Sequence, residues 1–369
     1  MTTSTPPGTA RALLTDPAQL IAALPYLLGF KPADSVVLLG HRPPGTRIGL
    51  ILRADLPPGD LLAEQADALA PRFRVDDHTG VTVVIVGGRA GPDGELPHAE
   101  FAGELSRALK EYELPVMHPL WTPEIAAGAP WACYREPTCS GLLPDPRDTV
   151  VAATITNAGF VSFPSRDDVL ALLEPRSPSA LVRRRALLSR AAPPWDPDDL
   201  RAAAAEVRAA FFRHRRAEGP PSDDQAVRLA HALRVPKVRD ACLATAVPPE
   251  SPVAVAAMSL WLELVRELPA PHRADAAALV AYAALMRSEG ALAGMALTNA
   301  RDACPDHVLA QLLHAAWNLG TDPSRLAGLA SLPDAVDLGL SLPELGLDPD
   351  ARPRPRDGLR LRPDRFGAV

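Results

Sequence analysis

The run Val81-Thr82-Val83-Val84-Ile85-Val86 is the strongest strand signal in the chain. A glycine-rich loop follows it, and the next residues predict a helix from about Glu95 to Tyr112. Apolar runs of similar length predict strands at 35–40, 48–55 and 114–121, with helices at 15–28 and 59–74. Because strands and helices alternate, the sequence predicts an α/β layer with a partly parallel sheet. The first two strands are expected to pair antiparallel across a short loop.

The second half of the chain lacks strand signals from about residue 176 onward. Ser222 followed by Gln225 gives a capping-box pattern, and Gly290 and Gly320 stand where helices commonly end. The expected helices cover 178–191, 197–217, 222–233, 237–246, 252–267, 273–288, 291–303 and 306–318. Together they predict a helical domain.

The sequence therefore predicts two domains of different class. The fold class is α+β or α/β for residues 15–175, with an N-terminal mixed sheet and flanking helices, followed by an all-α helical domain over 176–320. Within the latter, residues 273–319 resemble a tetratricopeptide-type hairpin without a full repeat. Residues 122–148 are expected to form an ordered excursion with a short hairpin. Residues 1–14 are expected to be a disordered leader, and 321–369 a Pro- and Arg-rich tail that is mostly flexible.

Composition and charge argue against several classes of protein. The chain has 369 residues, of which 47% are hydrophobic and 22% charged, so a fully disordered chain is not expected. The net charge of -6 argues against wholesale coating of nucleic acid. Four cysteines do not make a disulfide scaffold in a chain of this length. No signal peptide and no apolar stretch long enough for a membrane span are visible, so we expect a cytoplasmic protein without membrane partners.

A family resemblance covers most of the chain. It rests on Pro25-Tyr26-Leu27-Leu28-Gly29-Phe30-Lys31-Pro32-Ala33-Asp34-Ser35-Val36-Val37 and on Arg53-Ala54-Asp55-Leu56-Pro57. Weaker matches are Gly159-Phe160, Pro164-Ser165-Arg166, and Gly290-Ala291-Leu292 with Pro305. From about 13 to 320 the sequence resembles the actinobacterial domain-of-unknown-function family 4192. The resemblance implies an intracellular bacterial protein and brings no activity or catalytic residue with it. That family often has a Cys-Cys-Pro run where this chain reads Cys139-Ser140-Gly141.

A first candidate site lies at the predicted edge of the N-terminal sheet. Arg53 and Asp55 are two residues apart on a strand and share one face near its end. With Asp34 upstream, they are candidates for general acid/base and substrate-clamping roles in a ligand pocket. The alternative is a structural ion pair, with Asp34 as a turn residue.

The glycine-rich loop and the cysteines are two further candidates. Gly88 and Gly91 follow a strand and precede a helix, where backbone N–H groups can hold an anionic cofactor of unknown identity; the alternative is a plain turn. Cys133, Cys139 and His118 have the side chains that zinc prefers, but five residues separate the cysteines, more than in most structural zinc sites. Buried thiols or a redox-sensitive disulfide are the alternatives.

Three functions remain open on the sequence alone. We expect a non-catalytic interaction or regulatory protein that binds a protein partner through its helical domain, with an exposed apolar patch within 250–320. The first alternative is a small-ligand binder or enzyme with its pocket at the carboxyl edge of the sheet. The second is nucleic-acid binding through arginine clusters at 183–190, 213–216 and 352–365, which the surrounding acidic residues disfavour. Solvated faces are the simpler interpretation of these clusters.

Overall fold

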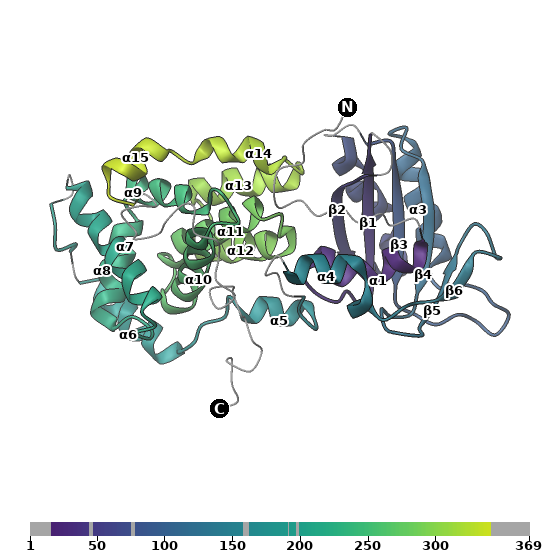
Figure 1. Ribbon diagram of the computed structural model, residues 1–369, viewed down its shortest axis with the longest axis horizontal. Coiled ribbons are helices and arrows are strands. Elements are labelled where there is room, and N and C mark those ends of the chain that lie inside the picture. Colours follow the sequence, from purple (N-terminus) through teal and green to yellow (C-terminus); the bar gives the residue numbers. More distant parts are fainter. Residues whose placement is uncertain are drawn as a thin grey trace. The chain divides into compact units, whose positions relative to one another are not determined.

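A six-stranded mixed sheet forms the centre of the N-terminal part of the chain (Figure 1). The computed structural model describes residues 16–43, 47–74, 78–157, 162–190, 192–196 and 199–340. The strands are β1 (Ser35–Arg42), β2 (Arg47–Asp55), β3 (Gly80–Val86), β4 (Val116–Thr122), β5 (Pro130–Cys133) and β6 (Ser140–Leu142), in the spatial order β2-β1-β3-β4-β5-β6. Only β3 and β4 pair in parallel, while the other neighbours are antiparallel. The predicted fold class, a mixed-sheet domain followed by helices, is confirmed.

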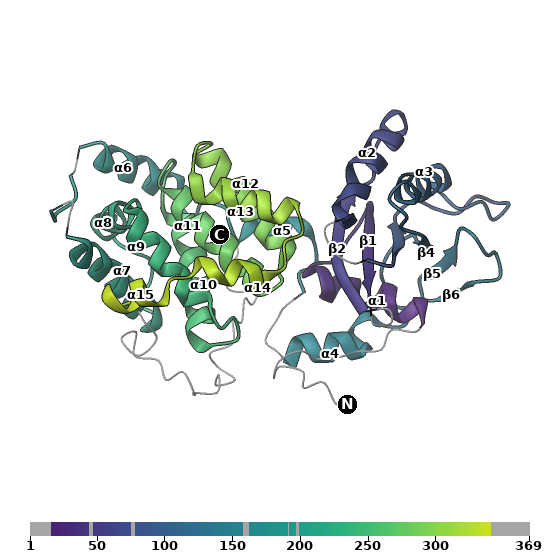
Figure 2. The same cartoon turned by 90° about the horizontal axis from the view of Figure 1, so that it is seen from above.

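Helices cover both faces of this sheet, as Figure 2 shows. Successive residues of a strand point to opposite faces, so Val36 and Leu38 of β1 pack with α2 (Leu62–Leu69) and α3 (Ala99–Lys110). Val37 and Leu39 pack instead with α1 (Pro17–Leu28), against which α4 (Val150–Asn157) also lies. All seven residues of β3 are buried, which explains why its sequence is apolar without alternation.

The chain divides into two units between Arg166 and Asp167, before the predicted boundary at 175. Short helices α5 (Arg166–Ala171) and α6 (Pro178–Leu188) begin the helical part. It continues with α7 (Leu200–Arg215), α8 (Asp223–Leu233), α9 (Pro236–Ala241), α10 (Pro252–Glu267), α11 (Arg273–Met286), α12 (Gly290–Ala303) and α13 (Val308–Asn318). Short 3₁₀ helices occur in both units: η1 (Gly59–Leu61), η2 (Ala70–Arg74) and η3 (Pro146–Asp148) in the first, and η4 (Cys242–Ala246) and η5 (Ala327–Leu329) in the second. The capping box at Ser222 and Gln225 is confirmed. Among the described residues, every helix is too short or too polar to span a membrane.

Part of the segment expected to be a flexible tail is helical in the structure. The helices α14 (Pro323–Leu326) and α15 (Leu332–Asp337) occupy it, and Leu326 and Ala335 are buried. Their N-caps are Asp322 and Ser331, each with a proline in the first turn, a local signal for a helix start that the high proline content masked. Residues 341–369 and the expected leader at 1–14 lie outside the described residues.

Helix α11 is the most deeply buried element of the helical unit, where it packs against α10, α12 and α13 (Figure 1). Every residue from Ala274 to Met286 is buried, and alanine at many of these positions lets the neighbouring helices approach closely. The carboxylate of Asp275 is buried within it. Its Oδ1 lies 2.9 Å from His307 Nε2 and 3.3 Å from an Arg239 guanidinium nitrogen. This ionic contact joins α11 to α9 and to the start of α13.

Removing that carboxylate tests the packing of the helical unit. We expect Asp275→Ala to lower the free energy of unfolding by about 3–5 kcal/mol, because it removes the carboxylate partner of buried His307 and one of the two carboxylates that Arg239 contacts. Urea denaturation followed by far-UV circular dichroism measures the effect, with exposed Asp337→Ala as the matched control. A loss below about 1 kcal/mol for Asp275→Ala, equal to the control, would contradict this view of the core.

Candidate functional site

The carboxyl ends of β3 and β4 define the edge of the sheet where the sequence predicted a site. Because β1 runs antiparallel to both of its neighbours, Ser35 at its start pairs with Asp55 at the end of β2 and with Val86 at the end of β3. The structure thus brings the predicted residues Asp34, Arg53 and Asp55 to the same edge as Gly88. Ligands in open α/β sheets bind at such edges.

The hydrogen bonds of Arg53 are satisfied within the protein. One terminal nitrogen lies 2.6 Å from Asp55 Oδ1, Nε donates to Ser35 Oγ at 2.9 Å, and the other terminal nitrogen donates to the Ala33 carbonyl at 3.4 Å. The guanidinium also lies over the ring of Phe30, 5.9 Å from its centroid. The Asp55 side chain is 76% exposed and faces solvent. This geometry is that of a partly exposed structural ion pair.

Backbone conformations at this edge are unusual. Asp34 and His98 have positive φ values of 43° and 58°, and Gly87 and Gly88 have values of 133° and 73°. A Cβ atom on Gly87 would lie 2.8 Å from Asp34 Oδ1, and one on Gly88 would lie 2.9 Å from Pro97 Cβ. Such conformations in non-glycine residues occur often at binding sites, where the surrounding structure holds them.

The two candidate glycines have different roles. The N–H of Gly91 donates to the Glu95 carbonyl at 2.8 Å, and its carbonyl accepts from Gly94 at 3.0 Å, so the loop closes on itself as a turn. Gly88 instead lies beside Pro97 and His98, the two residues that directly precede α3 in the sequence. His98 is the N-cap of α3 and makes no side-chain capping bond, which leaves the first N–H groups of this helix without a side-chain acceptor.

Segments that carry the family resemblance meet near this edge. Phe163 bridges to Phe30, with Phe163 N donating to the Gly29 carbonyl at 2.8 Å and Lys31 N donating to the Phe163 carbonyl at 2.9 Å. Leu56 N donates to the Asp34 carbonyl at 3.0 Å. Residues 159–160 lie outside the described residues. The matching motifs thus hold together the start of β1 and the end of β2.

Cys133 and Cys139 are neighbours across the β5–β6 hairpin. Cys133 N donates to the Cys139 carbonyl at 2.9 Å, so the two residues lie opposite each other. Burial, and then the neighbouring Cys133, raise the pKa of the Cys139 thiol. His118 is exposed on β4. Within the described ranges, no group of three or more His, Cys, Asp or Glu side chains is placed to hold a metal ion.

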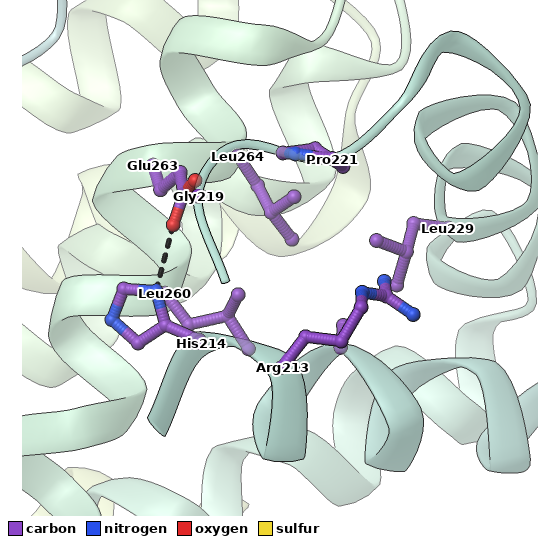
Figure 3. A pocket seen from close by; sticks show the side chains of 9 residues that line it. Arg213, His214, Gly219, Pro221, Leu229, Leu260, Glu263 and Leu264 are labelled. Atoms are coloured by element: carbon purple, nitrogen blue, oxygen red, sulfur yellow. Dashed lines mark hydrogen bonds and ion pairs between the residues drawn. The ribbon is translucent and has the colours of Figure 1, made fainter. Parts of the chain in front are cut away.

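A small cavity in the helical unit involves residues that the sequence did not single out (Figure 3). It has a volume of about 10 Å³ and lies between α7, α8, α10 and the loop at Gly219. His214 Nδ1 lies 2.7 Å from Glu263 Oε2, and its Nε2 lies 2.9 Å from Ser259 Oγ. Ser259 does not line the cavity, which has room for about one water molecule. The Ser–His–Glu chain therefore links α7 to α10.

Sequence reasoning missed His214 and Glu263 as partners for a definite reason. Ser259 and Glu263 are four residues apart and share a face of α10, which the sequence shows. Their partner His214 is 45 residues from Ser259 in the chain, and only tertiary packing places it opposite.

An open depression of about 610 Å³ lies in the N-terminal unit. Tyr26, Arg147, Ala152, Ala153 and Thr156 line it. The guanidinium of Arg147 binds Asp145, with Nε and a terminal nitrogen 3.0 and 2.7 Å from its two carboxylate oxygens, and this contact lowers the pKa of Asp145 to about 2. The cation that lines the depression is therefore already paired.

The arginine cluster at 183–190 differs from the solvated face that we expected. Arg184 is buried: its Nε lies 2.9 Å from Asp223 Oδ1, and a terminal nitrogen contacts Glu267. Arg183 lies 2.9 Å from the other carboxylate oxygen of Asp223, and it is the first cause of the lowered pKa of that carboxyl. Both arginines thus join α6 to the start of α8. Residues 352–365 lie outside the described residues.

The observations define a class of protein: a mixed-sheet unit followed by an all-helical unit. The chain belongs to the family described as a domain of unknown function (DUF4192), which it matches over residues 17–324. No curated protein and no solved structure matches the chain. The family match thus agrees with the resemblance seen in the sequence and adds no activity to it.

The two glycines of the loop provide a test of the geometry at the sheet edge. We expect Gly88→Ala to lower the free energy of unfolding by about 1–3 kcal/mol, because its positive φ and the close Pro97 ring oppose a side chain. Gly91→Ala is the matched control and should change it by no more than about 0.5 kcal/mol, because the nearest atom is 3.6 Å away. Urea denaturation measures both, and equal effects would show that the loop is packed differently.

Proposed function

We propose that this protein is a non-catalytic interaction protein that binds a helix of a partner protein on the outer face of α13. The observation that carries the proposal is an exposed apolar stripe. Val308, Leu312 and Leu319 are 75%, 50% and 54% exposed, and Ala315 between them is also exposed. The stripe lies inside the segment where the sequence predicted an apolar patch.

The spacing of the stripe suits a helical partner. The positions 308, 312, 315 and 319 are separated by four, three and four residues, which places them on one side of a helix. The same spacing forms the contact seam of two-stranded coiled coils. On the opposite side of α13, Leu309, Ala310 and Leu313 are buried against the rest of the unit. Exposed apolar stripes of this kind commonly receive an amphipathic helix of a binding partner.

Other features support placing this activity in a bacterial cytoplasm. The family resemblance implies an actinobacterial, intracellular protein, and four cysteines in 369 residues suit a reducing compartment. Nucleic-acid binding has less support, because Arg183 and Arg184 are paired with acidic side chains.

A single charge on the stripe tests the proposal. With Leu312→Glu, the amount of partner protein that co-purifies from the host should fall at least tenfold relative to wild-type protein. The reason is that a carboxylate would be buried in an apolar contact. The matched control is Val182→Glu, which places the same charge on an apolar residue of α6 that is 70% exposed. Quantitative affinity purification measures recovery, and native mass spectrometry separates a second copy of this chain from a different protein. Equal recovery with both variants would contradict the proposal.

Anion binding at the sheet edge is a second candidate function. It is favoured by the N-terminus of α3, which lacks a side-chain cap beside the positive-φ residues Gly88 and His98. Exposed Arg89 lies in the same loop.

A thermal-shift titration tests this second candidate. Pyrophosphate should raise the unfolding temperature of wild-type protein and of Arg190→Ala, a control arginine in the helical unit, because bound anion stabilises only the folded state. The rise should be smaller in Arg89→Ala. No rise, or the same reduction in both variants, would reject anion binding at this edge.

A further inference from the structure

The β5–β6 hairpin places two cysteines opposite each other. Trp131 pairs with Gly141 and Ala132 with Ser140, so the next pair in the same register is Cys133 with Cys139. The bond from Cys133 N to the Cys139 carbonyl, at 2.9 Å, continues the ladder to this pair. Residues directly opposite in antiparallel strands have Cβ atoms about 4.5–5.5 Å apart, close to the spacing that a disulfide needs.

The surroundings of the two thiols differ. Cys133 is buried in an apolar cluster with Leu120, Trp131 and Leu143, and Cys139 packs against that cluster from a partly exposed position. The other two cysteines are not part of this arrangement: Cys242 is buried in η4, and Cys304 follows α12.

We propose that Cys133 and Cys139 are a reversible redox site that forms an intramolecular disulfide by exchange with a small-molecule disulfide such as glutathione disulfide. Cys139 is the attacking residue because it is the more exposed of the two. Its thiolate attacks one sulfur of glutathione disulfide, which gives a mixed disulfide and releases one glutathione thiolate. The thiolate of Cys133 then attacks the Cys139 sulfur and releases the second glutathione.

The exchange is balanced in atoms and electrons. Two protein thiols are oxidised to one disulfide, one glutathione disulfide is reduced to two glutathione molecules, and the two thiol protons pass to the released thiolates. Because the attacking species is the thiolate, the raised pKa of Cys139 makes the exchange slower at neutral pH than that of an ordinary exposed cysteine. Below that pKa the rate rises by up to about tenfold for each pH unit.

The disulfide would fix the loop that links β5 to β6. Tyr134, the first residue of this loop, donates from its hydroxyl to the Pro97 carbonyl at 2.7 Å, directly before α3. Arg135 donates from its guanidinium to the Val116 carbonyl at 3.0 Å. The hairpin therefore contacts the edge near Gly88, and oxidation should make residues 134–138 more resistant to proteolysis.

Peptide mapping of the folded full-length protein tests the site. The protein is incubated with glutathione disulfide at pH 8 without denaturant, the remaining thiols are alkylated, and the digest is analysed by mass spectrometry. We expect a peptide in which Cys133 and Cys139 are linked and neither is alkylated, lighter by about 2 Da than the same peptide with two free thiols, in wild-type protein and in Cys304→Ser. Dithiothreitol should return it to the reduced mass, and raising the pH from 7 to 8 should accelerate its formation.

Cys139→Ser is the control variant for the wild-type protein. The peptide map of the wild-type protein tests the proposal even if this variant does not fold. This variant should form no intramolecular disulfide. Its Cys133 should react with the alkylating reagent only after the protein is unfolded, because this thiol is buried. Stable glutathione on Cys139 of the wild-type protein, without transfer to Cys133, would overturn the proposal. So would linkage that appears only in denaturant, or linkage to Cys304 instead.

Discussion

The complete burial of α11 is the constraint on which the helical unit depends. An alanine-rich helix that is buried on all sides must be surrounded by other helices, and α10, α12 and α13 supply that cover. Each of them uses its apolar side for this purpose. Asp275 then links neighbouring elements, because its buried carboxylate is compensated by Arg239, His307 and Arg234 from other parts of the unit. The outer side of α13 remains uncovered among the described residues, and its residues Val308, Leu312 and Leu319 are apolar. This mismatch between exposure and side-chain type is the basis of the proposed function.

The N-terminal unit depends in the same way on β3. Because β3 is buried on both faces, helices must cover the sheet on each side of it. The connection through α3 places the ends of the parallel strands β3 and β4 side by side. That edge collects Asp34, Arg53, Asp55 and Gly88. The position of these residues resembles that of a ligand site, but their contacts do not. Arg53 is bound to Asp55, Ser35 and Ala33, and the Asp55 side chain faces solvent.

The sequence predicted the strands and the long helices well, because apolar periodicity and capping residues such as Ser222 act locally. It also predicted that Asp34, Arg53, Asp55 and Gly88 lie at one edge of the sheet, since their positions follow from strand order. It did not predict that Arg184 is buried or that His214 contacts Ser259 and Glu263, because those contacts join residues far apart in the chain. The helices at 323–337 were missed because prolines at helix starts resemble the prolines of a flexible segment.

The most direct test of the central claim is photo-crosslinking in the host cell. A photoreactive amino acid is placed at position 312 of α13 in one protein and at position 182 of α6 in another, since both positions are exposed and apolar. The account predicts a crosslink to one defined partner chain from position 312 and none to that chain from position 182. Crosslinks of equal yield from both positions, or none from position 312 while position 182 reacts, would contradict a binding role for the outer face of α13.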